Sequence, residues 1–506
     1  MPEKVKLKLD KTVQKFIEQH KTGCAATSLT FWQHCRYQLI LWSLFLFFCY
    51  DYKLFAAFIL FLLTAFYGVT IAYRLLIIGL SLLFKPEIKI SQAELADLND
   101  DELPIYTILI PMYKEPEVAD KIIRAMNQLD YPSEKLDVKL LLEEDDSETV
   151  QLCQSLDLPE CIELLIVPHA MPKTKPKACN HGLLKAKGEF LVIYDAEDMP
   201  DSNQLRKAVA GFLKMPEKVV CLQAKLNYYN PYQNTLTKWF TLEYSAWFDL
   251  FLPGLHAIDA PIPLGGTSNH FRTEVLQELG GWDPFNLTED CDLGIRLHKH
   301  GWRSAVLDST TWEEANSQVG NWLRQRSRWV KGYIQTHFVH VRSNIKTIQQ
   351  LGPHGYASFI FTVGGLSLTL LLNPLFWIIG LTYLALAVGN IYELTPPPWQ
   401  MIYNDRVADL PGSPLTQWSQ LSHLFWFAAI ALLSANAVFV IINLIACCGR
   451  KMWRLIPYAL ISPLYWIFIS IAAWKGFLQL FSKPFYWEKT QHGLGEPDKK
   501  TDNISE

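Results

Sequence analysis

An apolar run from Leu54 to Phe84 constrains the fold of this chain more than any other stretch. A helix needs about 20 apolar residues to cross the hydrocarbon core of a bilayer, and this run is longer than that. Its one charged residue, Arg74, is expected to face protein or reach the interface, because a charge is costly among lipid tails. The preceding run, Leu39 to Tyr50, reaches a spanning length only if its helix starts near Phe31. We therefore expect a transmembrane hairpin over residues 37–85, with both of its ends on one side of the membrane.

A second apolar region covers residues 346–447. The stretch from Tyr356 to Ile391 is nearly uncharged but contains Asn373-Pro374, and Leu421 to Ala446 is a further spanning candidate. A Pro-rich polar loop lies between them at 392–418. We expect an interfacial or re-entrant helix before the proline, one span after it and another span at the second candidate.

The basic turn from Arg450 to Arg454 sets the topology that we expect. Loops rich in Lys and Arg tend to stay in the cytoplasm, so this turn is placed with the polar middle of the chain, after an even number of crossings. Residues 448–483 carry two prolines and Lys475, which favours a basic loop with interfacial helices over a span. The segments 1–36 and 484–506 are then both cytoplasmic.

Composition excludes several classes of function. Charged residues make up 19% of the chain, below the usual quarter of a soluble domain, and half of the residues are hydrophobic. The net charge of -4 gives no electrostatic case for nucleic acid as a partner. Ten cysteines show no C-x-x-C pair, which argues against a zinc site or a disulfide framework and fits a reducing compartment. The polar start of the chain is not followed by a short apolar core with a cleavage site, so we expect no cleavable signal peptide.

Residues 86–345 have the pattern of a soluble α/β domain. Strand-like apolar runs occur at Tyr106–Ile110, Val138–Leu142, Ile162–Val167 and Phe190–Tyr194. The first three are each followed by a stretch that suits a helix, such as Pro116–Leu129. This alternation predicts parallel βαβ units, and open sheets of this kind bind ligands at the carboxyl ends of their strands.

Acidic residues collect at these predicted strand ends. The first strand is followed by Tyr113 and Glu115, the second by the acidic run Glu143 to Asp146, and the fourth by Asp195-Ala-Glu197-Asp198. Packed carboxylates repel one another unless a cation lies between them, and hard oxygen ligands suit Mg²⁺ or Mn²⁺. The last cluster is therefore a candidate metal site formed by Asp195 and Glu197, with Asp198 as the alternative ligand. A solvated acidic loop explains this cluster alone equally well.

Two more clusters lie downstream. Thr288-Glu289-Asp290 precedes a helix predicted over Leu293–His298, where the helix dipole favours negative charge. The simpler alternative is an N-cap formed by Thr288 or Asp290. Gln325-Arg326-Ser-Arg328-Trp329 lies in a basic helical stretch before the second membrane region, where a basic face next to the membrane is the simpler alternative.

Sugar transfer from a nucleotide diphosphate sugar would use all of these clusters. Tyr113 is suited to stack on the base, and Glu115, with Glu144 or Asp145, is suited to accept N–H groups from it. The carboxylates at 195 and 197 are suited to hold Mg²⁺ or Mn²⁺ against the diphosphate.

The remaining groups suit the departing nucleotide and the acceptor. Arg328 and Gln325 would bind the released phosphates, since a guanidinium is a planar fork that matches oxyanions. Asp290 would take the proton of the acceptor hydroxyl, and Trp329 offers a surface for a sugar ring. A metal-neutralised diphosphate leaves without a proton, so one base suffices for a direct displacement that inverts the anomeric centre, whereas glycoside hydrolysis needs a paired acid and base.

These ordered motifs resemble those of the inverting family-2 glycosyltransferases, the group that contains bacterial cellulose, curdlan and hyaluronan synthases. The matching residues are Pro-x-Tyr-x-Glu at 111–115, the Asp-x-Asp-like Asp195-Ala-Glu197, Thr-Glu-Asp at 288–290 and Gln-x-x-Arg-Trp at 325–329. The resemblance implies a cytoplasmic α/β domain of GT-A-like fold, with a Rossmann-like mixed sheet, inserted between transmembrane and interfacial helices. It also implies Thr288, Glu289 and Asp290 as the catalytic motif. Two departures are Glu197 in place of the usual Asp and an acidic run, with no glycine, in place of Asp-Asp-Gly after the second strand.

Three further stretches resemble features of the same family. The stretch around Lys177 resembles its Lys-Ala-Gly-Asn motif, which implies that Lys177 approaches the donor phosphates. Gly266 and Thr267 stand where cellulose synthase has a Gly-Ser at the acceptor end. A C-terminal Phe-Tyr-Trp-Glu stretch that continues into Lys489 and Thr490 resembles the gating loop, which implies that these two residues touch the phosphates of the nucleotide.

The sequence therefore predicts a multi-pass enzyme of a bacterial plasma membrane that elongates a β-linked polysaccharide and passes it across the bilayer. We expect UDP-glucose as the donor, ahead of UDP-N-acetylglucosamine and GDP-mannose, Mg²⁺ or Mn²⁺ as the cofactor, and accessory export or periplasmic subunits as partners. The first alternative is transfer of a single sugar to a membrane lipid. The second is an inert export or scaffold subunit, against which the carboxylates at 195, 197 and 290 argue.

Overall fold

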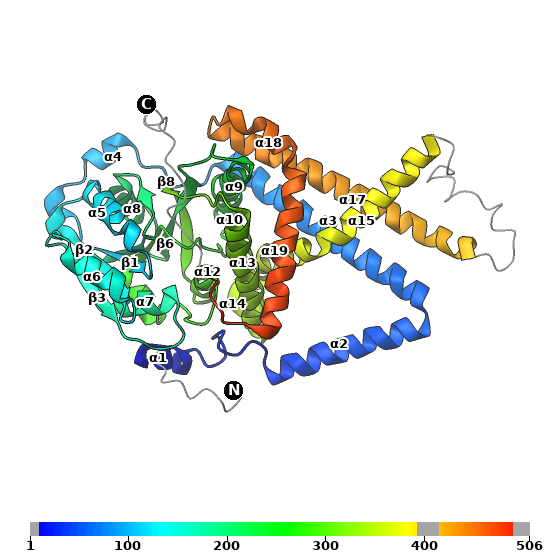
Figure 1. Cartoon of the computed structure of the whole chain (residues 1–506), viewed down its shortest axis with the longest axis horizontal. Helices are drawn as coiled ribbons and strands as arrows, with labels where there is room; N and C mark the ends of the chain where they lie inside the picture. The colour runs from blue at the N-terminus through cyan, green and yellow to red at the C-terminus, as the bar shows by residue number, and fades with distance from the viewer. Residues whose placement is uncertain (1–9, 392–413, 489–506) are drawn as a thin grey trace.

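The computed structural model describes residues 10–391 and 414–488 of the chain (Figure 1). Within these ranges, the polar middle of the chain forms one sheet of eight strands in the order β3-β2-β1-β4-β7-β6-β8-β5. The strands are β1 Tyr106–Met112, β2 Leu136–Glu143, β3 Ile162–Val167, β4 Phe190–Ile193, β5 Met199–Pro200, β6 Val219–Tyr228, β7 Asn269–Arg272 and β8 Arg303–Glu313. The first four overlap the four apolar runs that predict strands.

The sheet is mixed and covered by helices on both faces. β1 to β4 are parallel, β7 runs antiparallel between β4 and β6, and β6 is parallel to β8. One face packs against α5 (Ala119–Asn127), α6 (Ser147–Ser155) and α8 (Gln204–Lys214). The other packs against α7 (Lys175–Leu183), α10 (Leu252–Ala257), α12 (Glu289–Lys299) and the end of α3 (Tyr52–Phe84). Strands buried on both faces read as unbroken apolar runs, and the mixed, Rossmann-like sheet confirms the expected GT-A-like fold class.

Two helices of this domain carry the later motifs. α12 begins at Glu289, so the acidic motif forms its first turn instead of preceding it. α13 (Val319–His340) carries the Gln-x-x-Arg-Trp motif, and its Gly332 lies directly against Thr288. The two helices are therefore in close contact where both motifs lie.

Four helices among the described residues are long and apolar enough to cross a membrane: Tyr52–Phe84, Asn344–Thr382, Trp426–Gly449 and Ser462–Ser482. α3 forms the expected hairpin with α2 (Phe31–Tyr50), and Asp51 caps α3 by accepting the N–H groups of Lys53 and Leu54 at 2.9 and 3.0 Å. In Figure 1, α2, α3, α15 (Gly365–Ile391) and α17 (Pro414–Gly449) extend away from the sheet on one side. The α/β domain thus lies at one end of the membrane helices.

The structure does not interrupt the membrane helix at Asn373-Pro374. Pro374 lies inside α15, which continues α14 (Asn344–Phe359) through the π-helical turn η5 (Ile360–Gly364). The chain bends instead at Gly352, where φ is 71°. Proline is tolerated inside membrane helices because neighbouring groups compensate for the lost hydrogen bond. The predicted outer loop at 392–418 lies largely outside the described residues.

Helix α19 (Ser462–Ser482) packs along α13. The segment from Arg450 to Pro484 contains α19, and both of its ends contact the α/β domain. Arg450 binds Asp249 through hydrogen bonds of 2.5 and 2.8 Å, and Gln335 of α13 donates to the Pro484 carbonyl at 2.8 Å. Figure 1 shows α19 beside α13 and across the direction of α15 and α17. A folded domain lies on one side of a bilayer, so these contacts favour the predicted interfacial placement, although the length of α19 also suits a span.

The N-terminal segment packs against the α/β domain near Leu279 and Arg342. It contains α1 (Lys11–Gln19), and its His20 ring lies 2.9 Å from the Leu279 carbonyl. The Arg342 guanidinium donates to the carbonyls of Thr22 and Cys24 at 2.7 and 3.0 Å. This polar segment therefore lies on the same side of the membrane as the domain.

The substitution Gly332→Ala is expected to lower the free energy of unfolding by about 1–3 kcal/mol, the usual cost of overpacking. A methyl group at this position would lie 2.6 to 2.7 Å from atoms of Thr288, including its backbone nitrogen. The thermal unfolding midpoint in detergent measures the effect. Gly320→Ala on the same helix is the control, because a methyl group there meets nothing within 4 Å. Equal midpoints for the two variants would contradict this close packing.

Candidate active site

The carboxyl ends of β1, β4 and β8 open into a cavity of about 870 Å³. Most of the residues predicted for the site line it: Tyr113, Glu115, Asp195, Glu197, Gly266, Thr267, Thr288, Glu289, Asp290, Gln325, Arg328 and Trp329. Its other end is bordered by side chains of the membrane helices α3, α15 and α17 and of α19. The fold thus brings four distant motifs to one cavity that reaches into the membrane region.

Lys175, which the sequence motifs do not single out, lies at the centre of this cavity. Its ammonium group forms an ion pair with Asp195 and donates to the Gly266 carbonyl at 2.7 Å. A methyl group on Gly266 would lie 3.5 Å from the Oδ2 atom of Asp290 and 4.0 Å from Lys175 Nζ. Burial lowers the pKa of Lys175, but Asp195 and Glu289 outweigh it and leave that pKa raised. A protonated lysine therefore joins the candidate metal ligand, the acceptor loop and the candidate base.

Lys177 does not reach the cavity, contrary to the expectation from the family motif. Its side chain is fully buried, and its Nζ donates to Glu143 at 2.7 Å and to two backbone carbonyls at 3.2 Å. Residues two apart on a helix point about 200° apart, so Lys175 and Lys177 of α7 face opposite sides. The lysine next to the donor site is therefore Lys175.

Of the acids predicted to contact the base, Glu115 lines the cavity, whereas Glu144 and Asp145 lie outside its lining. Glu144 is exposed and accepts the backbone N–H of His169 at 2.8 Å, while Asp145 forms an ion pair with Lys173. Lys173 Nζ lies 5.8 Å from the centre of the Tyr113 ring, and Glu143 lines the cavity in their place. The second strand therefore reaches the cavity through Glu143. The loop after it contacts the cavity-lining Lys173 through Asp145.

Asp198 and Thr267 hold the loop that follows β4. Asp198 is buried, accepts the Asp195 N–H at 2.7 Å and accepts a hydrogen bond from the Thr267 hydroxyl. Burial and the neighbouring carboxylates Asp195 and Glu197 raise the pKa of Asp198 well above its ordinary value. Thr267 also reaches the Ile193 carbonyl at 3.0 Å, so its hydroxyl is used inside the protein. This arrangement leaves Asp195 and Glu197 as the carboxylates of the cluster that face the cavity.

Oxygen donors of this kind fit a divalent cation. Mg²⁺ is commonly bound by one or two carboxylates together with the phosphates of a substrate, and Asp195 and Glu197 supply two. Within residues 10–391 and 414–488, no three His, Cys, Asp or Glu residues converge on one metal position. Glu313, at the end of β8, adds a carboxylate that the sequence reasoning missed, and burial together with Asp198 and Asp195 raises its pKa. Its place at a strand end is the signal that would have found it.

Glu289 and Asp290 are adjacent acids, and both have raised pKa values. Burial raises the pKa of Asp290 to about 6, and burial together with the neighbouring Asp290 raises the pKa of Glu289 to about 8. The Cys291 N–H donates to Asp290 at 2.7 Å, and the charge of Lys175 favours the ionised form. Both acids therefore hold a proton to higher pH than an ordinary carboxyl group does, and the rise in pKa is larger for Glu289.

The motif on α13 lies opposite these acids. Arg328 is half-buried, and its guanidinium lies 4.3 Å from the centre of the Trp487 ring, which belongs to the gate-like C-terminal stretch. Gln325 accepts a hydrogen bond from Asn316 at 2.8 Å, and Trp329 lines the cavity with its ring 6.2 Å from that of Tyr244. Lys489 and Thr490 lie outside the described residues.

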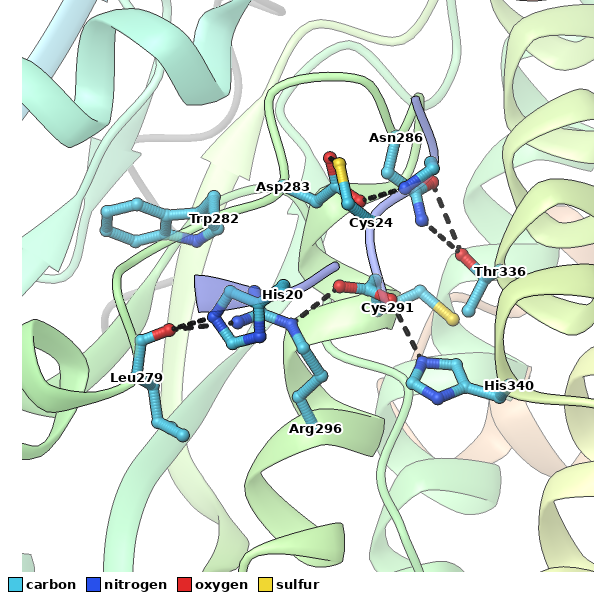
Figure 2. Close-up of polar contacts among 12 residues, drawn as sticks. His20, Cys24, Leu279, Trp282, Asp283, Asn286, Cys291, Arg296, Thr336 and His340 are labelled. Carbon is cyan, nitrogen blue, oxygen red and sulfur yellow. Dashed lines mark hydrogen bonds and ion pairs between the residues drawn. The ribbon is translucent and has the colours of Figure 1, made fainter. Parts of the chain in front are cut away.

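A buried polar network holds α12 against α13 from behind (Figure 2). Asp292 accepts from Arg296 at 2.7 Å and pairs with His340 of α13 at 2.9 Å. Asn286 donates to Thr336 of α13 at 2.9 Å. Burial raises the pKa of Asp292, but Arg296 and His340 outweigh it and lower that pKa to about 2. These contacts fix α12, which carries the candidate base, relative to α13, which carries Arg328.

Comparison with known proteins agrees with this geometry. Residues 104–332 match the family model described as "Glycosyltransferase like family 2". Over this segment the chain is similar to the glycosyltransferases of family 2. The chain is 27% identical over 246 residues to "Probable glycosyltransferase YdaM" of Bacillus subtilis (strain 168), covering 48% of this chain and 58% of that protein. It is 28% identical over 266 residues to "Probable glucomannan 4-beta-mannosyltransferase 7" of Oryza sativa subsp. japonica, covering 49% and 44%.

The chain therefore spans about half the length of the curated relatives that it matches. Among solved structures, it is similar to the mannosyltransferase PcManGT from Pyrobaculum calidifontis in complex with GDP-Man and Mn²⁺. That similarity has a TM-score of 0.42 and 18% identity, and covers 73% of this chain and 99% of the other.

The substitution Asp292→Asn is expected to lower the free energy of unfolding by about 3–5 kcal/mol, because it leaves the buried Arg296 cation without its anion and weakens the contact with His340. With a pKa near 2, Asp292 contributes fully at neutral pH, and that contribution is lost only as the pH falls below its ordinary pKa of 3.8. Thermal unfolding at pH 7 measures the loss. Asp259→Asn, which breaks an exposed pair with Arg303, is the control and should cost about 1 kcal/mol or less. A loss no larger than that of the control would contradict the network's role.

Proposed function

We propose that this chain transfers a sugar, with UDP-glucose as the donor, to the growing end of a β-linked polysaccharide and passes the product across the plasma membrane. The observation that carries the proposal is the single cavity that joins Asp195, Asp290 and Arg328 to the membrane helices. The Arg450–Asp249 contact places the basic turn with the domain, which supports a cytoplasmic domain by the positive-inside rule.

The donor lies along the strand ends in this proposal. Tyr113 stacks on the base, and Glu115 accepts a hydrogen bond from it. Lys175 and Arg328 hold the diphosphate, and their positive charge stabilises the departing nucleotide. A Mg²⁺ or Mn²⁺ ion on Asp195 and Glu197 would supply further charge neutralisation of the leaving group.

The acceptor hydroxyl lies between the donor sugar and Asp290. Asp290 is ionised at neutral pH and takes the hydroxyl proton as the acceptor oxygen attacks the anomeric carbon. Glu289 keeps its own proton and therefore does not compete as a base. A direct displacement with one base inverts the anomeric centre, so an α-linked donor gives a β-linked product.

Aromatic side chains support an extended glycan in the acceptor half of the cavity. Trp329 and Tyr244 form adjoining ring surfaces next to the catalytic end. Further along, Trp247 and Phe251 of η4 and Phe439 of α17 continue the lining toward the membrane helices. Sugar rings pack well on such faces, since their C–H groups meet the aromatic surface.

Transfer of one sugar to a membrane lipid is the second candidate, favoured by the apolar membrane half of the same cavity. Product size separates the two. Purified protein in nanodiscs is incubated with UDP-glucose, UDP-N-acetylglucosamine and GDP-mannose and with Mn²⁺ or Mg²⁺, followed by linkage analysis. GDP-mannose is included among the donors because one relative is named a mannosyltransferase. Long polymer supports the proposal, one sugar on lipid supports the alternative, and no nucleotide release with any donor contradicts both.

The substitution Asp290→Asn is expected to lower kcat for nucleotide release by about a hundredfold to ten-thousandfold, the usual contribution of a general base. In the native enzyme, kcat should rise with pH through about 6, because the base acts only after it loses its proton. Glu289→Gln is the matched control, since glutamine mimics the neutral acid, and it should keep most of the activity. A larger loss from Glu289→Gln than from Asp290→Asn would move the base to Glu289.

Chelation with EDTA is expected to abolish transfer, and Mn²⁺ or Mg²⁺ to restore it. Asp195→Asn should raise the metal concentration for half-maximal activity at least about tenfold, the lower end of what loss of one metal ligand usually costs. Asp145→Asn, whose carboxylate lies outside the cavity lining, should leave that concentration unchanged. Full activity in EDTA would contradict the metal site.

A further inference from the structure

Arg74 of α3 is a cation in the membrane half of the cavity. Its side chain is half-buried and lines the cavity, between the rings of Phe251 and Phe439 at 5.7 and 5.4 Å. Within the described part of the chain, no hydrogen bond or ion pair joins its guanidinium to another residue. A charge inside a cavity with an apolar lining is costly unless an anion pairs with it, and no described residue forms an ion pair with Arg74.

The other cations of the cavity divide clearly into two kinds. Lys173, Lys175 and Arg326 each form an ion pair with a carboxylate, namely Asp145, Asp195 and Glu243. Arg328, at the catalytic end, makes no ion pair among the described residues, as suits a group that binds the phosphates of a nucleotide. Arg74 is the second guanidinium of the cavity that makes no ion pair among the described residues, and it lies in the membrane half.

The carboxylate whose charge acts on Arg74 is already paired with another cation. Glu243, the carboxylate that faces this part of the cavity, is bound by Arg326 and by the Tyr465 hydroxyl at 2.9 Å. Two polar side chains of the small hollow next to Arg74 have hydrogen-bond partners of their own. Thr369 donates to the Gly365 carbonyl at 2.6 Å, and Asn436 donates to the Leu432 carbonyl at 2.8 Å.

The depth of Arg74 matches the level of lipid head groups. Ile77 and Ile78, one turn further along α3, already belong to the buried core of the α/β domain. Arg74 therefore lies where the membrane helix enters the domain, and the cavity around it is lined by apolar side chains such as Ile442 and Ile469. A ligand at this place would combine an anionic group at the guanidinium with an apolar body.

We propose that Arg74 binds the phosphate of a membrane lipid whose chains occupy the apolar half of the cavity. A guanidinium presents a planar fork of N–H donors that matches phosphate oxygens, and the rings of Phe251 and Phe439 hold that fork in place. A neutral glycan would leave the charge unpaired, whereas a phosphate pairs it. The inference rests on the proposed function only in taking this cavity as the acceptor side. It deepens the second candidate, transfer to a membrane lipid, because lipid chains and an extended glycan do not fill the same half of the cavity at once.

Binding to the full-length protein, purified in maltoside detergent and freed of lipid, tests this inference without any nucleotide sugar. The probes are undecaprenyl phosphate and undecaprenol, which share one chain and differ by the phosphate, and native mass spectrometry measures their occupancy. The native protein should prefer the phosphate about tenfold to a hundredfold, the range of charge-assisted hydrogen bonds. Arg74→Gln should remove that preference, and Arg74→Lys should keep part of it.

Lys53→Gln is the matched control, because it removes the other positive charge of α3 outside the cavity, and it should keep the full preference. Equal binding of the phosphate and the alcohol by the native protein, or an unchanged preference in Arg74→Gln, would overturn the inference.

Two further probes identify the source of the phosphate. Equal binding of phosphatidylglycerol would assign the site to a bilayer phospholipid, and weaker binding would assign it to a polyprenyl phosphate carrier. Displacement of both lipids by inorganic phosphate at low millimolar concentration would show that the guanidinium recognises phosphate alone, and would overturn the role of the lipid chain. Polymer formation is measured separately with the donor, so a failed binding test and a failed proposed function are distinguishable.

Discussion

The packing of α13 between α12 and α19 sets the geometry on which the site depends. Gly332 lets α13 approach Thr288 on one side, and Gly476 of α19 lets it approach on the other, where a methyl group would lie 2.5 Å from the Ser327 carbonyl. With two close backbone contacts, α13 has little freedom to slide or rotate. The base on α12, the arginine on α13 and the C-terminal stretch after α19 therefore keep fixed relative positions. The buried pairs of Asp292 reinforce this packing with directional contacts.

The charges of the cavity explain why the same geometry suits a phosphate donor. Asp195, Glu197, Asp290 and Glu313 line the cavity from two strand ends and one helix, and burial strengthens their mutual repulsion. Lys175 neutralises part of this charge in the protein alone. A donor with its cation would exchange that pair for metal–carboxylate and lysine–phosphate contacts, so the ligand relieves a repulsion that folding leaves in place. Binding and charge compensation are then the same event.

The sequence allowed the sheet and the main motifs to be predicted, because both signals are local. A strand buried on both faces needs an unbroken apolar run, and Phe190–Ile193 shows it, as does the acidic cluster that follows. Whether Lys175 or Lys177 faces the cavity depends on how α7 is rotated about its own axis. A motif with two lysines two residues apart does not contain that information. Glu313 ends a long strand that pairs with β6 far away in sequence, so its approach to Asp195 is a tertiary effect. The position of a helix break is also a tertiary effect. The sequence around Pro374 predicts an interruption, but α15 continues through it because neighbouring helices support the helix there.

Helix α3 connects the membrane to the chemistry in a direct way. Its Ile77 and Ile78 pack in the same core as Leu293 of α12 and Phe248 of η4, so the end of a membrane helix is also part of the domain's core. Ile78 lines the cavity as well. A ligand in the membrane half of the cavity therefore contacts an element that shares its apolar core with the helix of the candidate base. Because interiors of this density transmit small displacements, occupancy of that half and the position of Asp290 are expected to be coupled through α3 and α12.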